Sequence, residues 1–175
     1  MKYLECENLR LRALETEDIE LLYKWENDSS LWEFGNTLAP FSRSVLEEYI
    51  RDSRLDIYSV RQLRLMIELK SADNAAVGTV DLYDFDPHHS RAGIGILIDP
   101  LYQNRRVAAQ ALELIEAYAF GFLHLHQLYA YVPNANEASV KLFCKSGYES
   151  AGVLKEWLFV GEGWKDVTVF QKIAD

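Results

Sequence analysis

The chain has 175 residues, of which 18 are Lys or Arg and 27 are Asp or Glu, and its formal net charge is −9 at pH 7. This length predicts a single domain over residues 1–175, and the acidic balance argues against nucleic acid as a main partner because phosphate backbones favour clustered positive charge. No segment approaches the ~18 uninterrupted apolar residues of a membrane span, so we expect a cytoplasmic protein with no membrane partner.

The first half of the chain predicts strands that flank a helical region. Apolar residues alternate with Arg10 and Arg12 at the start, and a second alternation follows residue 62, both typical of half-buried strands. In the second, the apolar residues alternate with Arg64, Met66, Glu68 and Lys70. The predicted elements are a strand at 8–14, a helix at 16–27 capped by Thr16, a helix at 44–52 opened by a capping box at Ser44, and strands at 63–70 and 77–85 joined by a hairpin turn at 71–74.

The second half begins with an apolar strand at 92–98, followed by a short basic turn and a long alanine-rich helix from Val107. A strand at 128–132, a helix at 136–146 that stops at Gly147, and two strands around residues 161–163 complete the chain. The buried stripe predicted for the long helix consists of Ala108, Leu112, Ile115, Ala119 and Phe122. The whole order predicts an α/β fold with a mixed sheet and helices on both faces.

The basic turn between the strand at 92–98 and the long helix is suited to an anion. The first turn of a helix has backbone N–H groups without intrahelical partners, and Arg105 and Arg106 add two guanidinium groups. A pyrophosphate would fit there. The alternative is a basic loop that is merely solvated, as in many α/β proteins.

Two motifs resemble the GNAT superfamily of acyl-CoA-dependent N-acetyltransferases, in the branch of the spermidine and ribosomal-protein N-terminal acetyltransferases. One is a Gln/Arg-x-x-Gly-x-Gly/Ala loop, here Gln103 to Ala108, and the other an Asn-x-x-Ala/Ser helix that leads into a Gly-aromatic pair, here Asn136 to Tyr148. The resemblance runs from about Leu9 to Gln171. It implies a GNAT-like fold, with a mostly antiparallel sheet of about seven strands.

The resemblance also implies a cofactor, acetyl-CoA. Its pantetheine arm would pair with the strand at 96–98, and its pyrophosphate would lie on the basic turn. An ordinary helix cap is the alternative role for Asn136. The implied coenzyme-binding residues are Ile96, Leu97, Ile98, Gln103, Asn104, Arg105, Arg106, Val107, Ala108, Ala109, Asn136 and Ser139.

Three positions depart from the family pattern. Arg106, like its neighbour Asn104, stands where the phosphate loop commonly has glycine, and a positive φ at Arg106 would cost about 1 kcal/mol. Phe143 stands where the family often has a tyrosine that protonates the departing thiolate, a role left to solvent or to Ser139. Gly93 stands where spermidine acetyltransferases have a glutamate that meets the amine.

The general base is therefore open, and Asp84 at a strand end is the first candidate. We predict no metal site, because two adjacent histidines without a further ligand spacing are typical of a solvated turn. The two cysteines lie far apart and are expected to be buried, reduced residues. The other candidate bases are Asp86, His88, His89 and Glu33, and the cysteines are Cys6 and Cys144.

The function expected from these observations is acetyl transfer from acetyl-CoA to a primary amine in a ternary complex. The acceptor would be a small amine or polyamine, or a protein N-terminus. The alternative is a weakly catalytic acyl-CoA-binding sensor or assembly module on the same fold. A homodimer is expected by analogy alone.

Overall fold

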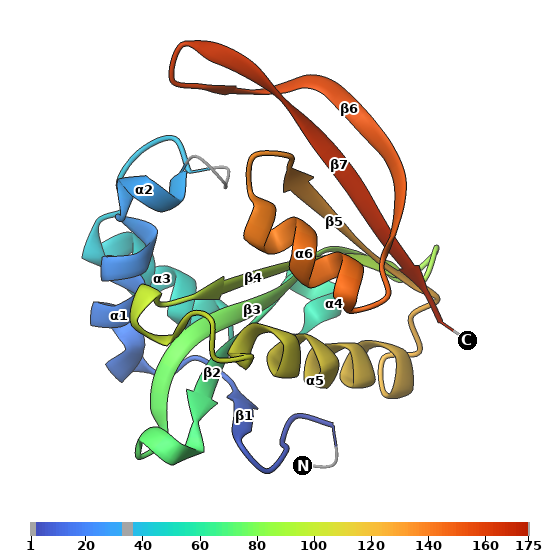
Figure 1. The fold of residues 1–175 in the computed structure, drawn as a ribbon. Helices are drawn as coiled ribbons and strands as arrows, with labels where there is room; N and C mark the ends of the chain where they lie inside the picture. The colour runs from blue at the N-terminus through green and yellow to red at the C-terminus, as the bar shows by residue number, and fades with distance from the viewer. Residues whose placement is uncertain (1–2, 33–36, 175) are drawn as a thin grey trace.

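The computed structural model describes residues 3–32 and 37–174, which form a seven-stranded sheet in the order β1-β2-β3-β4-β5-β7-β6 (Figure 1). Neighbouring strands are antiparallel except β4 and β5, which are parallel. The predicted mixed, mostly antiparallel sheet of about seven strands is confirmed. The strands are β1 (Leu9–Arg12), β2 (Leu63–Leu69), β3 (Ala75–Asp86), β4 (Arg91–Ile98), β5 (Gln127–Pro133), β6 (Glu149–Val160) and β7 (Gly163–Ile173).

The helices begin at residues that differ in detail from the predicted caps. Glu15, rather than Thr16, precedes the first helical turn, and the hydroxyl of Ser42, rather than of Ser44, accepts the bond from the Val45 amide. Neither α2 nor the short α4 was predicted as a helix. The helices are α1 (Ile19–Glu26), which follows a 3-10 turn at Thr16–Asp18, α2 (Ser29–Trp32), α3 (Arg43–Asp52), α4 (Ile57–Val60), α5 (Val107–Gly121) and α6 (Glu137–Lys145), with further 3-10 turns at Lys70–Ala72 and Pro100–Tyr102.

Two apolar cores lie on opposite faces of the sheet, as the period-two pattern of β2 requires. Leu65 and Ile67 belong to the larger core under α5 and α6, whereas Met66 between them belongs to the core under α1 and α3. Figure 1 shows α5 and α6 in front of the sheet and α1 and α3 to its left. No helix in the described ranges is long and apolar enough to cross a membrane.

Two expectations about burial were wrong. Phe122 does not extend the buried stripe of α5, because it follows the last helical residue, is exposed and stacks on Tyr118 with ring centroids 5.1 Å apart. Cys144 is exposed and Cys6 is half-buried, although both were expected inside. On α6 the neighbouring Phe143 faces the core instead of Cys144.

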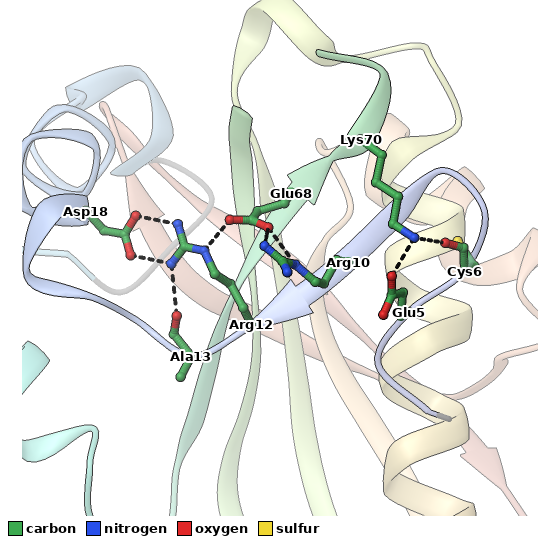
Figure 2. A network of polar contacts seen from close by, with 8 residues as sticks. All are labelled: Glu5, Cys6, Arg10, Arg12, Ala13, Asp18, Glu68 and Lys70. Atoms are coloured by element: carbon green, nitrogen blue, oxygen red, sulfur yellow. Dashed lines mark hydrogen bonds and ion pairs between the residues drawn. The ribbon is translucent and has the colours of Figure 1, made fainter. Parts of the chain in front are cut away.

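An ion-pair network fixes the start of α1 to the edge of the sheet (Figure 2). The guanidinium of Arg12 on β1 bonds both carboxylate oxygens of Asp18, at 2.6 and 2.8 Å, and also bonds Glu68 on β2. Arg10 bonds the other oxygen of Glu68 through Nε at 2.8 Å. Burial alone would raise the pKa of Glu68, but the two arginines outweigh it and lower that pKa.

Candidate active site

The two central parallel strands separate where a coenzyme arm is expected to lie. Residue pairs join β4 to β5 only at Arg91–Gln127, Ala92–Leu128 and Gly93–Tyr129. Beyond Gly93 the remainder of β4, including Ile96, Leu97 and Ile98, has no β5 partner along that edge. The main-chain N–H and C=O groups of β4 along this edge can therefore pair with the amide groups of an extended pantetheine arm.

The phosphate loop leads from β4 into α5 with its first-turn donors free of side-chain caps. Arg106, the residue before the helix, has φ +61° and caps no N–H with its side chain. Asn104 also has a positive φ, of +60°. Both positions thus adopt the left-handed conformation that favours glycine, as the family pattern suggested. The Val107 side chain is buried and anchors the turn, while the preceding residues 103–106 are exposed.

Arg105 and Arg106 are exposed at the surface of the phosphate loop. Arg105 and Arg106 line a small hollow of about 250 Å³ together with Asn8, Ser71 and Gln110. The Arg105 guanidinium carbon also lies 5.4 Å from the centre of the Tyr102 ring. The half-buried Ala108 and Ala109 follow in the first turn of α5, where small side chains keep the N–H groups accessible.

Asn136 caps α6, as its alternative role predicted. Its Oδ1 accepts a hydrogen bond of 3.1 Å from the Ser139 amide. Phe143, one of the family departures, is buried and meets the Tyr148 ring edge-on with centroids 5.0 Å apart. The side chain at this position therefore brings no hydroxyl to the site, and coenzyme contacts by Asn136 and Ser139 stay predictions.

A cavity of about 650 Å³ opens beside β4, on the face of the sheet that α1 and α3 cover. It borders the strand at Gly95, Ile96 and Leu97, so it adjoins the edge at which the arm is expected. Residues from α1, α2 and the segment 37–41 form its outer wall. Three alternate residues of β3 line its floor: Thr79, Asp81 and Tyr83.

Arg64 on β2 joins the two carboxylates of this cavity. Its Nε lies 2.5 Å from Asp81 Oδ1, and its Nη1 lies 2.5 Å from Glu26 Oε1. Its guanidinium carbon also lies 5.2 Å from the centre of the Tyr49 ring. Burial alone would lower the pKa of Arg64. The neighbouring Asp81, Tyr49 and Glu26 outweigh this effect and raise that pKa, so the arginine stays charged.

Asp84, the first candidate base, does not line the cavity. It is exposed, has φ +48° and lies in the bulge where the β3–β4 register shifts between Tyr83 and Asp86. Asp86 pairs with Arg91 at 3.3 Å, both His88 and His89 are exposed, and Glu33 lies outside the described residues. The carboxylate on β3 that reaches the cavity is Asp81, which sequence reasoning missed although the alternation of β3 places it on the same face as Tyr83.

The Tyr83 ring occupies the space that a side chain at position 93 would take. A Cβ built on Gly93 would lie 2.2 Å from Cε2 of the Tyr83 ring, so only glycine allows this ring position. The ring meets Tyr129 of β5 edge-on, with centroids 6.1 Å apart. Burial and the neighbouring Tyr129 raise the pKa of Tyr83, so its phenol is neutral at physiological pH.

The split sheet, the phosphate loop and the cavity coincide with a known family. The sequence profile described as the acetyltransferase (GNAT) domain matches residues 8–149. The chain belongs to the GNAT acetyltransferase family. A GNAT acetyltransferase is an enzyme that transfers an acetyl group from acetyl-CoA to an amine, so the cofactor expected from the sequence is confirmed.

Curated relatives of this GNAT acetyltransferase include spermidine N(1)-acetyltransferase of Escherichia coli K12, which is 28% identical over 91% of this chain and 82% of the relative. Another is an uncharacterized N-acetyltransferase of Bacillus subtilis strain 168, 25% identical over 95% and 94% of the two chains.

Solved structures resemble it over nearly the whole chain. Spermidine N-acetyltransferase of Vibrio cholerae in complex with CoA and spermine has a TM-score of 0.85, is 26% identical and is covered over 96% of both chains. A dodecameric structure of the Vibrio cholerae enzyme has a TM-score of 0.80 and 27% identity, with 96% and 95% of the two chains covered.

Proposed function

We propose that this acetyltransferase acetylates a small primary amine that binds in the cavity beside β4. The observation that supports this most is the position of the cavity, which borders the edge of β4 at Gly95, Ile96 and Leu97. An amine nitrogen there would lie next to the unpaired edge along which the acetyl donor is expected. The names of the Escherichia coli and Vibrio cholerae relatives support a small-molecule amine over the alternative acceptor, a protein N-terminus.

The donor would be held mainly by main-chain groups. Ile96, Leu97 and Ile98 would pair with the pantetheine arm, and the turn formed by residues 103–109 would bind the pyrophosphate through its N–H groups. Arg105 and Arg106 would add charge-assisted bonds at the edge of the turn. Side-chain identity matters little on the strand, because the pairing uses backbone atoms.

Asp81 is the residue that would attract the ammonium group of the acceptor. Its Oδ1 is held by Arg64, which leaves Oδ2 to attract an ammonium group in the cavity. After the ammonium loses a proton to solvent, the amine nitrogen forms a bond to the acetyl carbon, loses its second proton to solvent as the amide forms, and the carbon–sulfur bond breaks. The sulfur leaves as a thiolate, whose pKa of ~8.5 means that solvent can protonate it. Asp84, assigned from the sequence, is the competing candidate.

Release of the coenzyme thiol in the presence of acetyl-CoA and a panel of primary amines tests the proposal. We expect release above the amine-free background with at least one small amine. Stabilisation of the protein by acetyl-CoA without release from any amine would instead support the sensor or assembly module. An N-terminal peptide that alone gives release would favour the protein acceptor.

Self-association and a cytoplasmic location are part of the proposal. The β6–β7 hairpin projects from the sheet (Figure 1), and it exposes Trp157, Phe159 and Trp164. Its outer strand β6 is the edge of the sheet, which favours contact with a second chain. The dodecameric Vibrio cholerae structure supports an assembly larger than the homodimer expected from sequence. Light scattering of the purified protein measures this state.

A further inference from the structure

We infer that the cavity selects a primary amine with a single positive charge and an apolar, preferably aromatic, body over a polyamine. The inference rests on the proposed function and specifies its acceptor. It is carried by Tyr83 and Gly93, by the orientation of the aromatic walls, and by the charges that surround Arg64.

The floor of the cavity presents an aromatic ring in the space that a side chain at position 93 would take. The Tyr83 ring lies across Gly93, and its Cε1 would be 3.8 Å from a Cβ on Gly95. It therefore spans two successive floor positions of β4. A neutral phenol ring offers contact area and a π face to an acceptor, but no full negative charge to an ammonium group.

The aromatic walls have their polar atoms bound to the protein. The indole Nε1 of Trp25 donates to Asp99 Oδ2 at 2.8 Å, and the indole Nε1 of Trp32 donates to the Glu26 carbonyl, also at 2.8 Å. Phe41 has no polar side-chain atom, and its main chain is held by Asn27. What these walls offer to an acceptor is therefore apolar surface.

The charged residues that the structure describes in the cavity wall provide one place for a cation. Among the lining residues that the structure describes, the charged ones are Glu26, Arg64 and Asp81, which together carry one net negative charge. Both carboxylates converge on the same guanidinium, so they form one anionic place and not a series along the cavity. Among these described residues, the further ammonium groups of a polyamine would find no additional carboxylate, and their desolvation would be unfavourable.

The test compares acceptors on the wild-type enzyme by coenzyme thiol release. We expect kcat/KM for 2-phenylethylamine to exceed that for spermidine and spermine at least tenfold, with hexylamine between them. Equal or higher values for the polyamines, or for a peptide N-terminus, would overturn the inference while leaving amine acetylation intact. No release with any acceptor would instead reject the proposed function itself.

Two variants test whether Tyr83 and Gly93 set this preference. The double substitution Tyr83→Ala/Gly93→Glu removes the ring and introduces a carboxylate in its space, and it should shift the kcat/KM ratio at least tenfold toward spermidine. Tyr83→Phe retains the ring and should leave the ratio within twofold of wild type. Stabilisation by acetyl-CoA verifies that each variant is folded.

A third variant avoids dependence on the double substitution. Trp32→Ala removes a partly exposed aromatic side chain from the cavity wall. It should lower kcat/KM for 2-phenylethylamine at least fivefold, with less than a twofold change for spermidine. An unchanged acceptor ratio in both Trp32→Ala and the folded double variant would contradict the inference.

Discussion

Asp99 at the end of β4 accepts a hydrogen bond of 2.8 Å from the indole of Trp25 on α1. Lys24 bonds the same oxygen at 2.7 Å, and the other oxygen accepts from the Leu101 amide at 3.0 Å. The buried carboxylate thus joins the wall of the acceptor cavity to the beginning of the phosphate loop. We expect Asp99→Asn to lower the free energy of unfolding by about 2 kcal/mol in denaturant titrations and to raise KM for both substrates. The exposed Asp52→Asn, a control, should change stability by less than about 0.5 kcal/mol.

The same carboxylate predicts a loss of stability in acid. Burial alone would raise the pKa of Asp99, but the bonds from Lys24, Trp25 and the Leu101 amide outweigh it and lower that pKa. The ionised form therefore stabilises the fold above the ordinary aspartate pKa of ~3.9, and this contribution disappears as the pH falls through the lowered value. Melting temperatures measured below about pH 4 should decline less steeply for Asp99→Asn than for wild type. Parallel curves would contradict this assignment.

Arg106→Gly should stabilise the protein. Relief of the left-handed backbone at φ +61° is worth about 1 kcal/mol, and the N–H donors of the first turn are retained. Calorimetry should show acetyl-CoA affinity that is unchanged or tighter. Arg105, which is not in the left-handed region, provides the control, since glycine there should only lower stability. If Arg106→Gly lowered stability as much as Arg105→Gly, the backbone at Arg106 would not be strained.

Gly93 and Gly95 should tolerate a methyl group very differently. A Cβ on Gly93 would lie within 2.7 Å of three Tyr83 ring atoms, whereas a Cβ on Gly95 would meet its nearest atom at an ordinary 3.8 Å. Gly93→Ala should therefore cost about 1–3 kcal/mol and raise the acceptor KM as the ring is displaced. Gly95→Ala should remain close to wild type in stability. Equal stability of Gly93→Ala and Gly95→Ala would show that the Tyr83 ring moves aside at little energetic cost.

Asp81→Asn should reduce kcat/KM for the amine more than about tenfold at constant acetyl-CoA affinity, because it removes the charge that attracts the ammonium group. Asp84→Asn is the matched comparison, since that carboxylate lies on the same strand but is exposed outside the cavity. It should lose less than about twofold. The reverse order of the two effects would restore the assignment made from sequence.

The sequence predicted those parts of the structure that follow from local periodicity and from chain-order motifs. The alternation in β2 and β3, the apolar run of β4 and the glycine stop after α6 all correspond to observed elements. Ser42 was passed over because Ser44, two residues later, satisfies a capping-box pattern with Glu47. The four residues of α4 are too few to show a helical period.

The polar part of the acceptor site depends on register, which no single segment encodes. Arg64 and Asp81 are cross-strand partners, but a bulge between Ile67 and Glu68 separates them from the hairpin turn, so counting from that turn gives a different pairing. Glu26 joins them from a helix on another part of the chain. Tyr83 and Gly93 likewise meet only once β3 and β4 are aligned.

The narrow junction between β4 and β5 has a consequence for how the molecule responds to its donor. Only three residue pairs join β4 to β5, so we expect amide hydrogens on the open part of β4 that face the split to exchange readily with water. A substrate arm seated in the split would bond both halves and slow that exchange. Bound acetyl donor would then stabilise the contact between the two halves of the sheet, and each release of free coenzyme would weaken that contact again.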